Sequence, residues 1–205
     1  ATTVFINGQN VGEHKGGYTP FSCRLTPYLK PQRNTLIIVV EDSDSWQQPR
    51  GKQAGTTRWP IDYDPIIGIW QTVWLEPKSN LYLSAIRNHF SLDSGSIFFT
   101  YQLSKPTTAE ISTVLRLDGE EITRDLSVCD DRNEIRFKMR VPNPCLWSVK
   151  EPNLYELEIT ISENGEILDR VESYCGLREI EIREDRFLLN GEDVFLRGVL
   201  DQGYF

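Results

Sequence analysis

Residues 134–141 read EIRFKMRV, and this octapeptide decides the fold class of the chain. Apolar side chains occupy every second position, and charged side chains occupy the positions between them. Successive side chains of a β-strand point to opposite faces, so this spacing predicts a strand with one face in a hydrophobic core and the other in water.

The same alternation recurs in residues 155–161, YELEITI, and dominates the chain. No segment of about a dozen residues shows apolar side chains at the spacing of a helix. Seven short candidate strands within about one hundred residues are typical of an all-β, immunoglobulin-like β-sandwich. Their expected ranges are 81–90, 95–104, 108–118, 121–129, 133–141, 154–162 and 166–175.

Turn chemistry supports this interpretation. Four pairs of an asparagine or aspartate followed by glycine separate runs that resemble strands. Such pairs accept the positive φ angles that tight hairpins require. The pairs are Asn7-Gly8, Asp118-Gly119, Asn164-Gly165 and Asn190-Gly191.

Residues 76–80, EPKSN, combine proline with polar residues and are expected to link two domains. The preceding stretch, residues 68–75 (GIWQTVWL), is apolar on both faces of an extended chain. We expect it to form a strand that lies centrally in a sheet or is wedged between domains. Residues 1–76 then hold about four strands, too few to close a sandwich alone.

The composition excludes several classes of partner. The 205 residues carry a formal net charge of -8 and contain no stretch dense in Lys and Arg, whereas nucleic acids and anionic membranes require a basic face. No apolar stretch approaches the roughly 20 residues that cross a bilayer. We therefore expect neither a nucleic acid nor a membrane as partner, and a neutral substrate stays open.

The four cysteines are Cys23, Cys129, Cys145 and Cys175. They form no CxxC pair and have no histidine at zinc spacing, so we expect no metal site and no cofactor. Reduced thiols are favoured, since a core of this size needs no disulfide, and a Cys129–Cys175 disulfide is the alternative in an oxidising compartment. A cytoplasmic location is favoured, with a periplasmic or secreted one left open because the chain begins within an apparent strand.

Several longer stretches follow one another in a recognisable order. They are NGQNVGEHKGGYTPF (residues 7–21), PRGKQ (49–53), GIWQTVWLEP (68–77), LWSVKEPNLYELEI (146–159) and GLREIEIREDRFLLNGEDVFLRGV (176–199). Together they resemble glycoside hydrolase family 2, the family of β-galactosidases and β-glucuronidases. The resemblance covers nearly the whole chain, and its specificity comes from the ordered set rather than from any one motif.

The resemblance implies a domain order. Residues 1–76 correspond to the C-terminal part of a sugar-binding jelly-roll domain, and residues 77–176 to an immunoglobulin-like β-sandwich. Residues 177–205 correspond to the lead-in hairpin and first strand of a catalytic (β/α)₈ barrel. The chain is thus expected to be a fragment of a multi-domain enzyme.

The resemblance also implies a function. The parent enzyme is expected to be a retaining β-glycosidase of the β-galactosidase type that hydrolyses terminal β-linked sugars, with a β-glucuronidase as the alternative. Retaining hydrolysis needs two carboxyl groups, one as acid/base and one as nucleophile. In this family both are glutamates that would lie beyond residue 205, so we expect no catalytic residue and no activity in this chain. The Asn133-Glu134 pair is interpreted as a solvated strand end.

Four residues are candidates for substrate binding, three by resemblance and Trp59 by the chemistry of its side chain. In several family members an aspartate lies six residues before the glycine that opens the last jelly-roll strand, which places Asp62 there, although Asp64 competes. A carboxylate can accept two hydroxyl hydrogen bonds. Trp59 lies in the same stretch, where its indole can stack on a pyranose ring. Asp201 and Gln202 fall at the C-terminal end of the first barrel strand, where barrel chemistry occurs.

Bland alternatives stay open for these residues and for the chain. Asp62 can be an ordinary loop acid, and Trp59 can pack against the next domain. A free-standing carbohydrate-binding module and a purely structural β-sandwich are the rival functions. Homo-oligomerisation through unprotected sheet edges also stays open. The expected partner is a carbohydrate, bound mainly by the absent barrel.

Overall fold

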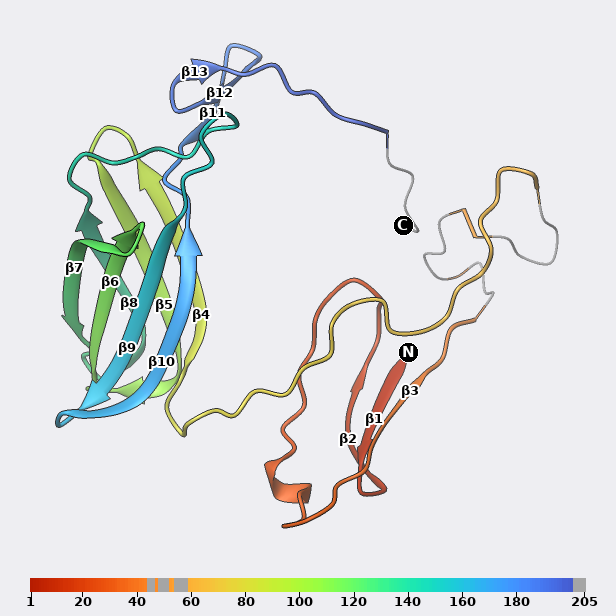
Figure 1. Cartoon of the computed structure of the whole chain (residues 1–205). Coiled ribbons are helices and arrows are strands. Elements are labelled where there is room, and N and C mark those ends of the chain that lie inside the picture. Colours follow the sequence, from red (N-terminus) through yellow and green to blue (C-terminus); the bar gives the residue numbers. More distant parts are fainter. Residues whose placement is uncertain (44–46, 48–51, 54–58, 201–205) are drawn as a thin grey trace. The chain divides into compact units, whose positions relative to one another are not determined.

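The computed structural model describes residues 1–43, 47, 52–53 and 59–200. The described chain is built from strands with one short 3₁₀ helix, which confirms the all-β prediction. It divides into two compact units, one containing residues 1–74 and the other residues 75–197, and each is considered by itself (Figure 1). Over the described ranges, no helix has the length and apolar character needed to cross a membrane.

The second unit is a sandwich of two antiparallel sheets, and its seven strands confirm the seven expected from the sequence. One sheet has the order β4-β5-β8 and the other the order β10-β9-β6-β7. The fourth strand of the sandwich pairs with the third, which differs from the constant-type immunoglobulin arrangement. The strands are β4 (Leu83–Ser91), β5 (Ser96–Thr107), β6 (Glu110–Leu117), β7 (Glu120–Val128), β8 (Arg132–Arg140), β9 (Tyr155–Glu163) and β10 (Glu166–Cys175).

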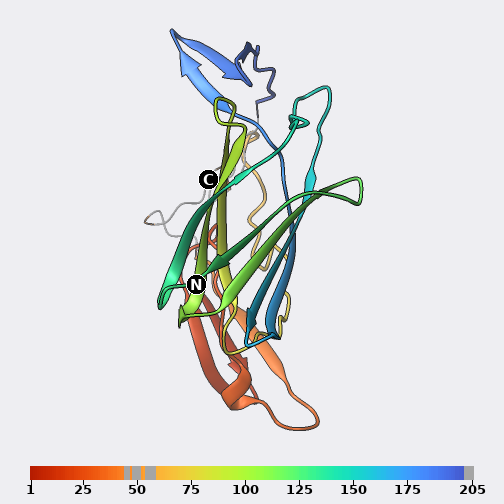
Figure 2. The same ribbon diagram turned by 90° about the vertical axis from the view of Figure 1, so that its left-hand side faces the viewer.

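The core lies between these two sheets, which face each other in Figure 2. Every second residue of the central strands is buried, as the period of two requires. The inward side chains of β5 and β8 meet those of β6 and β9. Among them are Ile97, Phe99, Tyr101, Leu103, Ile111, Leu115, Met139, Tyr155, Leu157, Ile159 and Ile161.

A buried hydrogen bond joins the two sheets. The hydroxyl groups of Tyr101 on β5 and Thr113 on β6 lie 3.1 Å apart, and both residues are 0% exposed. Burial raises the pKa of Tyr101 well above 10, so the phenol stays neutral in the fold. Because each hydroxyl is enclosed by apolar side chains, the bond fixes the position of one sheet against the other.

Tyr155 fixes the corner between β8 and β9. It is the first residue of β9, and its hydroxyl accepts a 2.8 Å hydrogen bond from the backbone N–H of Cys145. Burial raises the pKa of Tyr155, which keeps this phenol neutral too. A tyrosine at the start of this strand that bonds upstream backbone corresponds to the tyrosine corner of immunoglobulin-like sandwiches.

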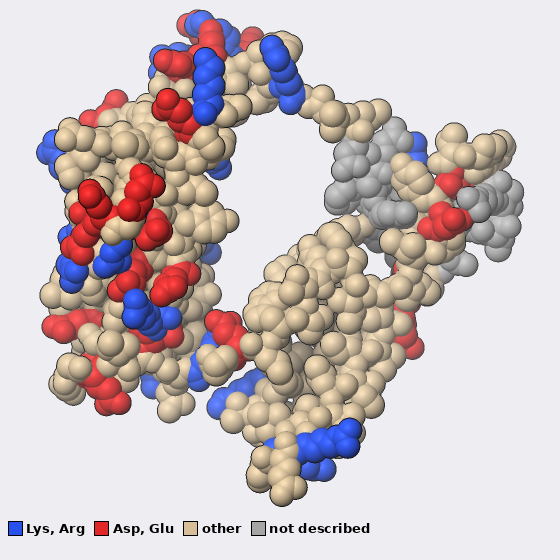
Figure 3. Space-filling view, viewed as in Figure 1, with Lys and Arg blue, Asp and Glu red and all other residues tan. Residues whose placement is uncertain are grey.

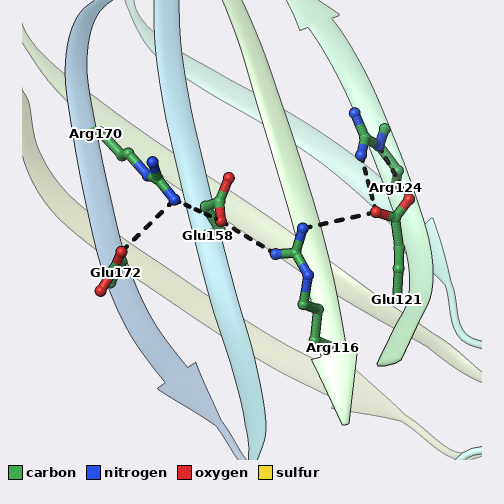
Figure 4. Close-up of polar contacts among 6 residues, drawn as sticks. All are labelled: Arg116, Glu121, Arg124, Glu158, Arg170 and Glu172. Carbon is green, nitrogen blue, oxygen red and sulfur yellow. Dashed lines mark hydrogen bonds and ion pairs between the residues drawn. The ribbon is translucent and has the colours of Figure 1, made fainter. Parts of the chain in front are cut away.

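The outward face of the four-stranded sheet carries a chain of ion pairs, drawn in Figure 4. Acidic and basic side chains also intermix on the face of this unit seen in Figure 3. The pairs cross all four strands, so each cation of the chain contacts a carboxylate. In order they join Glu172, Arg170, Glu158, Arg116, Glu121 and Arg124, at distances of 2.8 to 3.7 Å.

Two short hairpins follow the sandwich within the same unit. They are built from β11 (Ile180–Arg183), β12 (Arg186–Leu189) and β13 (Glu192–Asp193). Asn190 holds them in place, because its amide accepts from Glu179 N and donates to Trp147 O, each at 3.0 Å. A Cβ on Gly176 would lie 3.2 Å from the Trp147 side chain, so glycine allows this close packing.

The first unit contains a three-stranded antiparallel sheet of order β2-β1-β3. Its strands are β1 (Thr2–Ile6), β2 (Gln9–His14) and β3 (Leu36–Val40), and the 3₁₀ helix η1 (Thr26–Tyr28) lies between β2 and β3. Asn7 and Gly8 have φ angles of 52° and 84°, as predicted for the hairpin turn. The pairs at 118–119, 164–165 and 190–191 are likewise all at positive φ.

One expected strand is wrong. Residues 68–75 form no strand, and Trp70, Trp74 and Leu75 are 63%, 67% and 75% exposed. A strand that is apolar on both faces needs a layer on each side, and the described part of its unit supplies one three-stranded sheet. The expected lead-in hairpin is present, and residues 194–200, the described part of the stretch expected to contain the first barrel strand, form no strand.

All four cysteines are free thiols, and Cys129 and Cys175 are buried in the sandwich. Burial raises the pKa of Cys129, and it raises the pKa of Cys175 from 9.0 to about 11. A buried thiolate would lack hydration, so the fold favours the neutral thiol.

We predict that Tyr101→Phe lowers the free energy of unfolding by about 1–3 kcal/mol, because it leaves the buried Thr113 hydroxyl without its partner. Urea unfolding measures this change. Adding Thr113→Val should recover part of the loss, since both polar groups are then absent. The control Tyr174→Phe, at a residue 70% exposed, should change little.

We also predict that stability falls at high pH. Because the folded-state pKa of Cys175 lies above its unfolded value, its contribution is complete below pH 9 and is lost as the pH rises through about 11. The slope is at most about 1.4 kcal/mol per pH unit for one group. In Cys175→Ala the decline between these pH values should be shallower, and an unchanged slope would contradict this assignment.

Candidate functional site

The candidate site is a loop in the first unit, built around a turn at residues 59–62. Asp62 N donates to Trp59 O at 3.0 Å, which closes the turn. The Asp62 side chain also binds Trp59, because Oδ2 of the carboxylate accepts a hydrogen bond from Trp59 N at 2.8 Å. A short acidic side chain that binds nearby backbone is a common device for stabilising turns.

A second segment joins this turn. Tyr63 N donates to Lys52 O at 2.9 Å, and Gln53 and Tyr63 form a parallel bridge. The Gln53 side chain also reaches the loop, where Oε1 accepts from Ile66 N at 3.0 Å. The glutamine of the GKQ motif therefore fixes the loop that carries Trp59 and Asp62.

The loop displays an aromatic surface beside a carboxylate. Trp59 is 67% exposed, and Asp62 is half-buried. Within the described residues, Oδ1 of Asp62 takes no hydrogen bond, so it is available to a hydroxyl donor. An open indole face next to a hydrogen-bond acceptor suits a ligand that is apolar on one face and hydroxylated at its edge.

The structure thus brings Trp59 and Asp62 together, while the other two predicted residues, Asp201 and Gln202, lie outside the described residues. The indole N–H of Trp70 is already used within the fold, because Nε1 donates to Gly17 O at 2.7 Å.

The Asn133-Glu134 pair lies at the start of β8. Oε1 of Glu134 accepts from Arg136 Nε at 2.9 Å, and both side chains point to solvent. A general acid needs a carboxyl group whose pKa is raised by burial. Glu134 is partly exposed, with 38% of its side chain accessible, and is paired with an arginine, which supports the interpretation as a solvated strand end.

Two further observations bear on the chemistry. The Arg124 hydrogen bonds lower the pKa of Glu121, the opposite direction from a general acid. Across the described ranges, no three His, Cys, Asp or Glu side chains gather in a group able to hold a metal ion.

Sequence reasoning missed one surface, a shallow cavity of about 490 Å³ on the outward face of the three-stranded sheet of the sandwich. Its lining includes Arg87, His89, Phe98, Arg136 and Lys138. The alternation in EIRFKMRV placed the cations outward but did not reveal which residues of β4 and β5 lie beside them.

Comparison with known proteins identifies the family. Residues 86–178 match the family described as glycosyl hydrolases family 2. Over 96% of the chain, the sequence is 30% identical to a β-galactosidase of Thermoanaerobacter pseudethanolicus (strain ATCC 33223 / 39E), of which it covers 27%. The chain belongs to glycosyl hydrolase family 2. A β-glucuronidase of Paenibacillus borealis is 26% identical over 95% of this family 2 chain, which covers 34% of that relative.

Solved structures of similar proteins share the fold of this family 2 chain. A β-glucuronidase from Ruminococcus gnavus, in complex with uronic deoxynojirimycin, superposes with a TM-score of 0.75 at 21% identity; the match covers 96% of this chain and 34% of that one. A β-glycosidase from Bacteroides vulgatus gives a TM-score of 0.73 at 23% identity, covering 98% and 25%. The chain therefore spans about a quarter to a third of the length of the relatives named here.

We predict that Asp62→Ala loosens the turn at Trp59. The variant loses the acceptor for Trp59 N, so that amide should exchange with solvent at least about tenfold faster. Hydrogen exchange followed by NMR measures this rate. Asp62→Asn is the matched control, because its side-chain carbonyl can still accept; an equal acceleration in both variants would contradict the hydrogen bond.

Proposed function

We propose that this chain is the non-catalytic, substrate-positioning portion of a retaining β-glycosidase of the β-galactosidase type. The observation that carries the proposal is the 30% identity to a β-galactosidase over 96% of the chain. The similarity extends over both units. The substrate class follows: terminal β-linked sugars of oligosaccharides or glycosides.

The chemistry of retention supports a non-catalytic role. It requires two carboxyl groups about 5–5.5 Å apart, one of which stays protonated near neutral pH. Glu134 is partly exposed and paired with Arg136, and the carboxylates at 121, 158 and 172 form ion pairs with arginines on a sheet face. None of these carboxylates forms, with a second one, the enclosed pair that retention requires.

Sugar binding by the first unit is the positive part of the proposal. Trp59 offers its exposed ring to the C–H face of a pyranose, while Asp62 Oδ1 accepts from a hydroxyl. Oδ2 is already used within the turn, so the carboxylate is held in one orientation before the sugar arrives. Asp201 and Gln202 are proposed as further contacts in the parent enzyme on the family resemblance alone.

A β-glucuronidase is the second candidate. The 26% identity to the Paenibacillus borealis β-glucuronidase favours it. The two candidates differ in the charge of the substrate, because a glucuronide carries a carboxylate where a galactoside has a hydroxymethyl group. A carboxylate beside Asp62 would be repelled, so the loop geometry favours the neutral galactoside.

We predict that the 205-residue chain releases no nitrophenol above the blank from nitrophenyl β-galactoside or nitrophenyl β-glucuronide. The absorbance at neutral pH follows the reaction over hours. Hydrolysis that disappears in Glu134→Gln would show that Asn133-Glu134 is catalytic and would overturn the proposal. Hydrolysis that survives this substitution would overturn it equally.

A further inference from the structure

The outward face of the sheet β4-β5-β8 concentrates positive charge. The outward positions of β8 are Arg132, Glu134, Arg136, Lys138 and Arg140, and Arg87 of β4 lies on the same face. These outward positions therefore hold five cationic side chains and one carboxylate, in a chain whose net charge is -8. This excess of positive charge is local, and its sign is opposite to the net charge of the protein.

The strand register arranges these residues in two rows. In the first row, the His89 ring stacks on Phe98 with centroids 4.7 Å apart and planes 7° apart. Lys138 Nζ lies 5.3 Å from the Phe98 ring. The row is therefore an aromatic platform that ends in an ammonium group.

In the second row, Thr100 lies between Arg87 and Arg136. Neighbouring strands are about 4.8 Å apart, so the two arginines stand about 10 Å apart across a small side chain. That difference in size hollows the sheet surface, and the cavity of about 490 Å³ is lined by both rows. Its volume is within the range of small-ligand sites.

The two outward faces of the sandwich handle charge differently. On the four-stranded sheet each arginine of the chain in Figure 4 contacts a carboxylate. Beside the cavity, Arg136 is held by Glu134, whereas Arg87 and Lys138 form no ion pair with any residue that the structure describes. Unneutralised cations around a hollow attract an anion, and an arginine fork matches a carboxylate or sulfate in shape.

We propose that this cavity binds an anionic oligosaccharide, one that carries uronate or sulfate groups. The aromatic platform of His89 and Phe98 binds the face of a sugar ring, and Arg87 and Lys138 bind its anionic groups. The ligand class, a carbohydrate, rests on the proposed function; the negative charge rests on the cavity itself. A cationic strand at a sheet edge also discourages pairing with another sheet, but that role requires neither a cavity nor an aromatic row.

The test is calorimetric titration of the 205-residue chain with tetragalacturonate at about 20 mM salt, where surface charges are weakly screened. Binding is expected, and Arg87→Gln with Lys138→Gln should weaken it at least about tenfold. Arg124→Gln with Lys150→Gln removes the same charge elsewhere on the unit and should weaken it less than about twofold. A sulfated tetrasaccharide in place of tetragalacturonate separates uronate from sulfate recognition.

Three results would overturn the proposal: no binding of either anionic sugar, equal binding of neutral cellotetraose, or an equal loss in both double variants. Equal binding of hexaglutamate would show that charge alone holds the ligand and would assign the face to an acidic peptide instead. Because the titration measures binding and not hydrolysis, its failure leaves the nitrophenyl assay of the proposed function independent.

Discussion

The sandwich depends on how its two sheets are held face to face. Apolar side chains from alternate positions supply most of the stabilisation, but they specify the relative position of the sheets only loosely. The Tyr101–Thr113 hydrogen bond adds a directional contact in the middle of that core. The alternation along each strand and the pairing registers then determine which positions face outward. These outward positions carry the chain of ion pairs on one face, and on the other face Arg87 and Lys138, which form no ion pair with a described residue.

The sequence predicted the sandwich well because its strands are long, alternate strictly and are separated by turn residues with a defined conformation. Asn164-Gly165 illustrates this, since both residues adopt the positive φ that the pair favours. The Glu184-Asp185 turn escaped notice because it contains no glycine and begins with a glutamate, which is not a usual choice for positive φ, although the two residues have values of 49° and 63°. Residues 68–75 misled for another reason: apolar content predicts burial only where a second layer is present.

The candidate site was only partly predictable. The resemblance placed Trp59 and Asp62 near a sugar, but a sequence cannot show that Asp62 uses one oxygen to bind the Trp59 backbone. The tyrosine corner was also not predictable from the sequence, because the fold joins the Tyr155 hydroxyl to a backbone N–H ten residues away. The basic cavity needed the pairing register of three strands, which no single stretch of sequence contains. Contacts between strands were beyond prediction, while patterns within strands were not.

We propose that this family 2 chain binds sugar without cleaving it. NMR of the 205-residue chain with nitrophenyl β-galactoside tests binding and cleavage in one sample. The account predicts that the indole resonance of Trp59 shifts with added ligand while the anomeric signal of the galactoside stays constant for hours. Loss of that anomeric signal to free galactose, or an unmoved Trp59 resonance at saturating ligand, would contradict it.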